Sequence, residues 1–163
     1  MTFALSVSVY RTTTTDPLAN PLLDELTHEY TTRYGASEDL RSYPAEEFLP
    51  PRGTFLLLLE QGRPVAGGAY RRYDEHTAEL KRIWTHSEHR RRGLARRVLD
   101  ELERDAAARG YSRIFLTTGP RQPEAKGLYL ATGYRPLFDV TADPESIGPL
   151  PFEKHLDLEI PTP

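Results

Sequence analysis

The sequence predicts an α/β protein in which helices flank a mixed, mostly antiparallel central sheet. Short apolar runs separated by tight turns between residues 54 and 85 predict three successive antiparallel strands. From residue 93 to 110 the apolar residues recur at helical spacing instead, with charged residues on the opposite face. A further strand is predicted at 112–118. Because the helix at 93–110 connects it to the strand before, these two strands should run parallel.

The first third of the chain predicts one strand and one helix. Segment 3–11 alternates apolar residues with smaller or polar ones, which is typical of a half-buried strand. Two Asx-Pro pairs, Asp16-Pro17 and Asn20-Pro21, indicate a helix start, and the helix should end at Gly35. Residues 36–53 contain three prolines and are expected to form a loop with a short helix at Pro44–Phe48.

The central strands carry two further expectations. Gly67-Gly68 permits a bulge or the close approach of another backbone. Strict alternation from Thr77 to Thr85 would place Lys81 and Ile83 on the face of Glu79, and Leu80, Arg82 and Trp84 on the other. The expected elements of this region and of the C-terminal part are strands at Thr54–Glu60, Pro64–Tyr73, Thr77–Thr85, Ser112–Thr118, Tyr134–Val140 and Phe152–Ile160, and helices at Gly93–Gly110 and Gln122–Thr132.

Composition favours a single domain over residues 1–163 and excludes several function classes. The 163 residues are 38% hydrophobic, and the formal net charge of −3 provides no basic field for nucleic acid. The chain has no cysteine, and its five histidines are not spaced as metal ligands, so we expect no metal. No signal peptide and no apolar run long enough to span a bilayer is seen, so we expect a cytoplasmic protein without membrane contact.

The segment Arg90-Arg91-Arg92-Gly93-Leu94-Ala95-Arg96 carries the most specific chemistry. It follows a predicted strand and opens an amphipathic helix, so the free N–H groups of the first helical turn can bind an anion. Glycine and alanine let a ligand approach the backbone, and the arginines add charge-assisted contacts that suit a diphosphate. A solvated basic helix start is the plain alternative. A nucleic-acid patch is disfavoured because acidic residues follow on the same helix.

From Ala78 to Tyr134 the sequence resembles the GNAT superfamily of acetyl-CoA-dependent acetyltransferases. The family signature Gln/Arg-x-x-Gly-x-Gly/Ala at a strand-to-helix turn is matched by Arg90-x-x-Gly93-x-Ala95. A second element, Asn-x-x-Ala-x-x-Leu-Tyr-x-x-x-Gly-Phe, is matched over 122–134 except that Gln122 replaces Asn and Tyr134 replaces Phe. The resemblance implies a GNAT-like fold with a splayed strand pair, and acetyl-CoA as the cofactor.

The resemblance also implies residue roles. Backbone amides of residues 91–96 would bind the pyrophosphate, and the strand before the turn would pair with the pantetheine arm through Ile83 and Thr85. The expected cofactor-binding set is Ile83, Trp84, Thr85, Arg90, Arg91, Arg92, Gly93, Leu94, Ala95, Arg96, Gln122, Ala125 and Tyr129.

Two residues are candidates for proton transfer. Tyr129 matches the family tyrosine that donates a proton to the leaving sulfur, and the alternative is a tyrosine that only packs in the core. Glu79 matches the general base of the histone acetyltransferase branch; its alternative is an ion pair with Lys81 or Arg82. Many family members use a chain of water molecules in place of a base.

The acceptor is expected to bind near Tyr30, Arg33, Tyr34, Lys81 and Thr117. An arginine near the amine would suit a substrate carboxylate. The sequence therefore favours the primary amine of a small molecule, such as an amino acid or a xenobiotic. The alternatives are a protein or peptide amine, and a non-catalytic acyl-CoA-binding module. The family also allows a homodimer.

Overall fold

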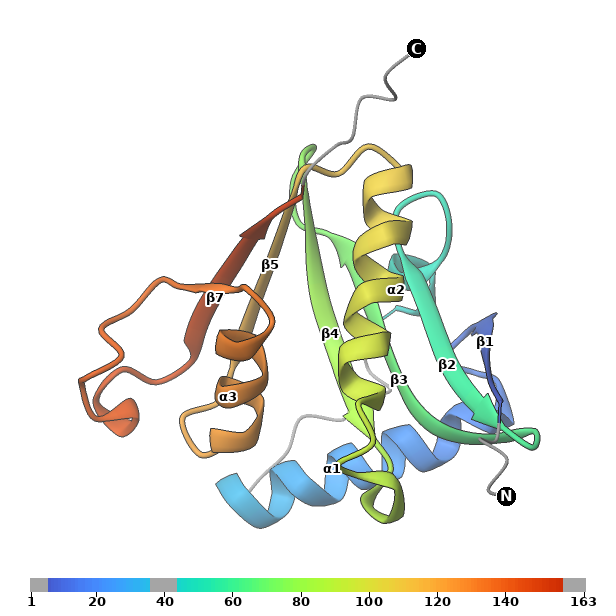
Figure 1. Cartoon of the computed structure of the whole chain (residues 1–163), viewed down its shortest axis with the longest axis horizontal. Helices are drawn as coiled ribbons and strands as arrows, with labels where there is room; N and C mark the ends of the chain where they lie inside the picture. Colours follow the sequence, from blue (N-terminus) through green and yellow to red (C-terminus); the bar gives the residue numbers. More distant parts are fainter. Residues whose placement is uncertain (1–5, 36–43, 157–163) are drawn as a thin grey trace, which may run out of the picture.

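A computed structural model describes residues 6–35 and 44–156, and within them seven strands form one sheet (Figure 1). The strand order is β1-β2-β3-β4-β5-β7-β6. Every adjacent pair is antiparallel except β4 and β5, which run parallel as the crossover requires. The strands are β1 (Val7–Thr12), β2 (Thr54–Glu60), β3 (Arg63–Arg72), β4 (Thr77–Thr85), β5 (Arg113–Thr118), β6 (Arg135–Pro136) and β7 (Leu150–His155).

Helices cover both faces of the sheet. Helices α2 (Leu94–Ala108) and α3 (Pro123–Ala131) lie on one face, and α1 (Asn20–Tyr34) crosses the other (Figure 1). Short 3-10 helices complete the chain path: η1 (Pro17–Ala19), η2 (Ala45–Phe48), η3 (Ser87–His89) and η4 (Pro144–Ser146). Among the described residues, no helix combines the length and apolar character needed to cross a membrane.

Each face of the sheet has its own hydrophobic core. The apolar stripe of α2, with Leu94, Val98, Leu99, Leu102 and Ala106 all buried, packs on the face that carries Leu80 and Tyr70. The core on the opposite face forms where α1 and η2 meet the sheet; it contains Leu22, Leu23, Leu26, Phe48 and Trp84. The apolar positions predicted for α1 and α2 are therefore the ones that these helices bury against the sheet.

Strands β4 and β5 part soon after they begin to pair. Their register covers only Thr77↔Arg113, Ala78↔Ile114 and Glu79↔Phe115, although β4 continues to Thr85 and β5 to Thr118. The two strands diverge toward their C-terminal ends, where α1 and α3 lie (Figure 1). The expected splayed pair is thus present, and it leaves an opening between β4 and β5 without ladder hydrogen bonds.

A bulge at Arg82 corrects the predicted faces of β4. The register passes from Ala69↔Lys81 to Gly67↔Trp84, so Arg82 and Ile83 together lie opposite the single residue Gly68. Arg82 adopts the left-handed backbone conformation, with φ of 58°. Its guanidinium lies 4.7 Å from the ring centre of Phe48, on the α1 side.

The extra residue reverses the alternation beyond it. Ile83 packs against the α2 core and Trp84 belongs to the α1 core, the opposite of the predicted placement. Gly68 leaves room for these side chains, because a Cβ there would lie 2.7 Å from Cδ1 of Ile83 and 3.0 Å from Cγ1 of Val98, and both would have to shift.

The predicted strand over 134–140 is wrong for most of its length. The ladder with β7 covers only Arg135 and Pro136, followed by one hydrogen bond from Leu137 N to Pro151 O at 2.9 Å. Asp139 then accepts hydrogen bonds from the backbone N and the hydroxyl of Thr141 in a turn. The last strand begins two residues earlier than expected and ends at His155. Residues 3–5, 36–43 and 157–160 of the predicted elements lie outside the described residues.

Candidate active site

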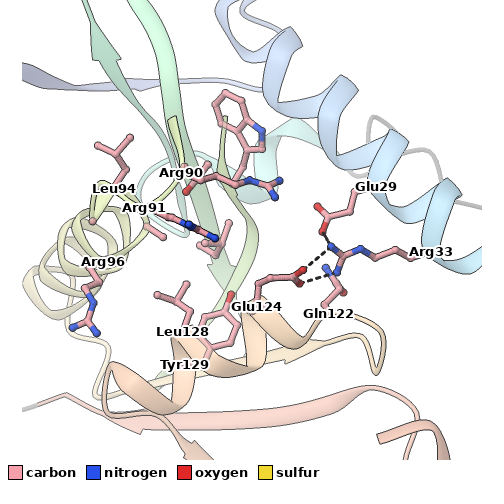
Figure 2. A pocket seen from close by; sticks show the side chains of 16 residues that line it. Glu29, Arg33, Arg90, Arg91, Leu94, Arg96, Gln122, Glu124, Leu128 and Tyr129 are labelled. Carbon is pink, nitrogen blue, oxygen red and sulfur yellow. Dashed lines mark hydrogen bonds and ion pairs between the residues drawn. The ribbon is translucent and has the colours of Figure 1, made fainter. Parts of the chain in front are cut away.

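A cavity of about 320 Å³ opens where β4 and β5 part. Its walls come from the end of β4, the turn that begins α2, the first two turns of α3, and the C-terminal half of α1 (Figure 2). Most of the residues that the sequence assigned to a cofactor meet here, although they come from three separate segments of the chain.

The turn before α2 presents free donors to this cavity. Its first backbone bond runs from Arg97 N to Gly93 O at 3.2 Å, and no side chain caps the helix. The amides of residues 94–96 therefore lack intrahelical acceptors. Gly93 has φ of 75°, and a Cβ built on it meets no atom within 4 Å, so the space beside it is open. Such an uncapped helix start favours an anionic ligand.

The arginines of this turn divide into two groups. Arg90, Arg91 and Arg96 line the cavity, and Arg90 and Arg91 extend over it in Figure 2, whereas the Arg96 guanidinium points away from its centre. Arg92 is not among the lining residues. Its guanidinium binds the Glu60 carboxylate and lies 2.8 Å from Nδ1 of His89. The hydrogen bond from Arg92 lowers the pKa of Glu60 below its ordinary value.

The end of β4 forms the second wall, through Ile83, Trp84 and Thr85. Beyond the bulge, Ile83 faces α2 and Trp84 faces α1. The indole Nε1 of Trp84 donates to a carboxylate oxygen of Glu25 at 2.9 Å, so Trp84 is fixed against α1.

Helix α3 contributes Tyr129, which was predicted as the acid. Its side chain is 5% exposed, and its ring packs against those of Tyr134 and Phe152, each with centroids 5.5 Å away. The hydroxyl points into the cavity beside Leu128 (Figure 2). Burial raises the pKa of Tyr129 above its ordinary value, so the phenol keeps its proton and can donate it.

Gln122 and Ala125 also line the cavity. Oε1 of Gln122 accepts hydrogen bonds from Gly119 N at 2.9 Å and from the Tyr34 hydroxyl at 3.3 Å. These contacts direct the side-chain oxygen toward the loop between β5 and α3.

Glu79, the other proton-transfer candidate, does not line the cavity. Its side chain is 8% exposed; Oε1 accepts from Arg71 Nε at 2.9 Å, and Oε2 lies 3.6 Å from Lys81 Nζ. Arg71 binds Glu47 as well, at 2.8 Å. Glu79 and Lys81 therefore belong to an ion-pair cluster near the start of β4.

Of the remaining acceptor candidates, three lie together on α1 and one lies on β5. Arg33 lines the cavity, whereas Thr117 is exposed on β5 and does not. The rings of Tyr30 and Tyr34 are 6.3 Å apart, and Tyr34 contacts the loop between β5 and α3. Burial raises the pKa of Tyr30 although a hydrogen bond with Gln122 opposes the shift.

Sequence reasoning missed Glu29, Glu124 and Leu128, which also line the cavity. The Glu124 carboxylate binds Arg33, which is 91 positions earlier in the chain. No local pattern signals a contact of that separation. Leu128, by contrast, stands inside the quoted motif and could have been included.

Comparisons with known proteins agree with this geometry. Residues 20–134 match the model of the acetyltransferase (GNAT) family. The uncharacterised N-acetyltransferase YsnE of Bacillus subtilis is 30% identical over 115 residues, which cover 68% of this chain and 76% of that protein.

Solved structures with the same fold extend over nearly the whole chain. A Klebsiella pneumoniae protein assigned as an acyl-CoA N-acyltransferase is 26% identical with a TM-score of 0.74, covering 92% of this chain and 97% of that one. The PaiA N-acetyltransferase of Thermoplasma acidophilum, solved with coenzyme A, is 16% identical with a TM-score of 0.70, over 93% and 99% of the two chains. At that identity the second likeness shows the fold alone.

Proposed function

This chain belongs to the GNAT family of N-acetyltransferases and is an acyltransferase, and from that premise we propose that it moves the acetyl group of acetyl-CoA to the primary amine of a small molecule. One observation carries the proposal. The uncapped start of α2 and the Tyr129 hydroxyl face the same cavity, at the point where β4 and β5 part.

The residues present fit coenzyme A. The amides of residues 94–96 and the guanidinium groups of Arg90 and Arg91 would hold the diphosphate. The unpaired edge of β4 from Ile83 to Thr85 would receive the amide-rich pantetheine arm. When bound, acetyl-CoA supplies the thioester whose acetyl group is transferred.

Tyr129 is the residue we assign to proton donation. Its phenol lies in the cavity, packed by Tyr134 and Phe152, and burial keeps it protonated. A positioned acid of this kind can protonate a leaving thiolate, a role typically worth about 10²–10⁴-fold in rate.

We assign no side chain as the base that takes the proton of the attacking amine. Among the described residues, Glu29 and Glu124 are the only carboxylates in the cavity lining, and both bind Arg33. Glu79 lies outside that lining, in its cluster with Arg71 and Lys81. We propose that water carries this proton away.

The acceptor class rests on a different argument from the one the sequence suggested. Both η nitrogens of Arg33 are engaged: Nη1 and Nη2 hydrogen-bond to Arg121 O and Glu124, and Nη2 forms an ion pair with Glu29 at 3.2 Å. This arginine is therefore not available for a substrate carboxylate. The same contacts join α1 to the loop between β5 and α3 beside the cavity. This arrangement supports a compact acceptor over an extended peptide that would need to lie across the opening.

Two measurements test the proposal. Calorimetry should show binding of acetyl-CoA, and mass spectrometry should show an acetylated product from a pool of amino acids and small amines. Products from a peptide pool alone would transfer the assignment to a protein or peptide amine. Tight binding of acetyl-CoA with no product from either pool would indicate a non-catalytic acyl-CoA-binding module.

A further inference from the structure

The two walls of the opening are not held together by the sheet. Ladder pairing between β4 and β5 ends at Glu79↔Phe115, and both strands then continue separately toward the cavity. The β4 wall leads into the turn at the start of α2, and the β5 wall leads into α3 with Tyr129. Some other element must fix the distance between the two walls.

Helix α1 contacts the β4 wall through Glu25. One oxygen of this carboxylate accepts from Trp84 Nε1 at 2.9 Å and from Ser87 N at 3.0 Å; the other accepts from Ser87 Oγ at 2.7 Å. A single α1 side chain therefore holds both the end of β4 and the loop that leads to α2. The hydrogen bonds from Ser87 and Trp84 outweigh burial and lower the pKa of Glu25.

The last turn of α1 contacts the β5 wall through a reciprocal pair of arginines. Arg33 Nη1 donates to Arg121 O at 2.8 Å, and Arg121 Nη1 donates to Arg33 O at 2.8 Å. Arg33 also binds both carboxylate oxygens of Glu124, in the first turn of α3, at 3.0 and 3.2 Å.

Tyr34 tightens the same contact. Its hydroxyl accepts from Arg121 N at 3.1 Å and donates to Gln122 Oε1 at 3.3 Å. A Cβ on Gly119 would lie 1.9 Å from that hydroxyl, so only glycine fits beneath Tyr34. Figure 2 shows α1 and α3 joined by Arg33 and Glu124 at the edge of the cavity.

We propose that α1 bridges the open end of the splay, fixing the spacing of the β4 and β5 walls and limiting the entry of water. In this proposal Arg33 is a positioning residue that acts through α3, and it does not bind the acceptor. The catalytic consequence rests on the proposed function, because it requires a bound thioester.

The consequence is a competing hydrolysis that the bridge suppresses. If the walls separate, a water oxygen can bond to the thioester carbonyl carbon as the C–S bond breaks. The products are acetic acid and the CoA thiol, and no amine is consumed. One proton of the water passes to the sulfur, and the other stays with the new carboxyl group, which releases it to solvent at neutral pH. Exclusion of water by a closed site is a recognised means of preventing this reaction.

The contact between α1 and α3 on which the bridge depends can be measured without any ligand. Because the chain has no cysteine, His28→Cys on α1 and Gly127→Cys on α3 would provide two unique sites for spin labels. Both positions are exposed, and no atom lies within 4 Å of a Cβ at Gly127. Double electron–electron resonance would measure the distance between the two labels, in the doubly labelled chain and in the same chain carrying Arg33→Met.

Arg113→Met is the matched control. Arg113 is 25% exposed and its Nε lies 2.8 Å from Glu153, whereas Arg33 is 22% exposed and lies 3.0 Å from Glu124. Glu124→Gln, on the more exposed partner, is a milder second variant in case Arg33→Met does not fold.

We expect a narrow distance distribution for the parent and for Arg113→Met, and a broader one for Arg33→Met and Glu124→Gln. The hydrolysis ratio is the rate of CoA release from acetyl-CoA without amine, divided by the rate of amine transfer measured with amine present. It should rise about tenfold or more in Arg33→Met, given how strongly reaction depends on a 1 Å displacement. The proposal would be overturned if the distance distribution of Arg33→Met matched that of the parent. It would also be overturned if that distribution broadened while the ratio of hydrolysis to amine transfer stayed the same. If the parent fails to bind acetyl-CoA, the proposed function fails while the distance measurement still decides on the bridge.

Discussion

The carboxylate of Glu79 accepts a hydrogen bond from Nε of Arg71 at 2.9 Å. The same guanidinium donates from Nη1 to Glu47, which comes from η2 on the α1 side of the sheet. Glu79 is thereby committed to a contact between β4 and β3. We expect Glu79→Gln to lower the free energy of unfolding by about 1–2 kcal/mol, because a buried charged hydrogen bond is weakened while Arg71 keeps Glu47. Turnover at saturating substrates should stay close to that of the parent. A large fall in kcat with unchanged stability in urea would instead identify Glu79 as the base.

Replacement of Tyr129 by Phe should lower kcat by about 10²–10⁴-fold, the usual range for a positioned acid, with little change in the Kd of acetyl-CoA. Tyr134→Phe is the control, because its ring packs on Tyr129 but its hydroxyl donates to Glu103 at 2.9 Å, away from the cavity. That variant should lose about 1 kcal/mol of stability and keep its kcat. Equal turnover of the Tyr129→Phe and Tyr134→Phe variants would reduce Tyr129 to a packing residue.

The pH profile provides a second check on Tyr129. Burial raises its pKa above the ordinary value of 10.0, so the phenol stays protonated throughout the range in which the protein is assayed. We expect no loss of kcat from ionisation of this group between pH 7 and pH 10. An alkaline loss of activity below pH 10 that disappears in Tyr129→Phe would contradict the assignment.

Gly93→Glu should weaken acetyl-CoA binding by at least about tenfold, or 1.4 kcal/mol, because the new carboxylate meets the site proposed for the diphosphate. Gly110→Glu, at the other end of α2, is matched to it. Both glycines have positive φ, 75° and 94°, and at neither does a Cβ meet an atom within 4 Å. Each variant should lose about 1 kcal/mol of stability from the backbone alone, but only Gly93→Glu should lose affinity in calorimetry. Unchanged affinity would remove the cofactor from this turn.

Asp105→Asn should destabilise the protein by about 2–3 kcal/mol at neutral pH, since its carboxylate accepts from Tyr70, Thr54, Arg11 and Arg109 and is 7% exposed. Burial alone would raise the pKa of Asp105, but the hydrogen bonds from Tyr70, Arg109 and Thr54 lower it below 3.8 overall. A lowered pKa in the folded state means that this contribution is complete above pH 3.8 and is lost as the pH falls through the folded value.

Denaturation of the parent and of Asp105→Asn should therefore converge as the pH is lowered below 3.8. Asp100→Asn, on an exposed position of the same helix, should follow the parent at every pH. A constant difference between the parent and Asp105→Asn down to pH 2 would show that the carboxylate charge is not what stabilises this contact.

Local patterns predicted the elements that have a strong period or a specific turn. The apolar stripe from Leu94 to Ala106 defines α2, and the spacing of Arg90, Gly93 and Ala95 located the turn that lines the cavity. The strand expected at 134–140 failed because Leu137 and Val140 are apolar yet 38% and 44% exposed. Apolar character alone does not distinguish a strand from an irregular surface segment.

The rest of the site depends on contacts that no local pattern encodes. Glu25 binds Ser87, 62 positions away, and Arg33 binds Arg121, 88 positions away. The side chains of β4 were placed wrongly because Arg82 adopts a backbone conformation that glycine usually takes. Gly67-Gly68, directly opposite, indicated a bulge but not the strand that would carry it.

The same bulge makes β4 sensitive to its length in a way that substitution does not reveal. Deletion of Arg82 would leave Ile83 alone opposite Gly68 and restore regular pleating, with Ile83 still facing α2 and Trp84 still facing α1. Loss of Ile83 as well would turn the indole of Trp84 toward α2, so that this core would receive a side chain of the wrong size. Homologous chains should therefore tolerate loss of the one bulged residue far better than loss of two.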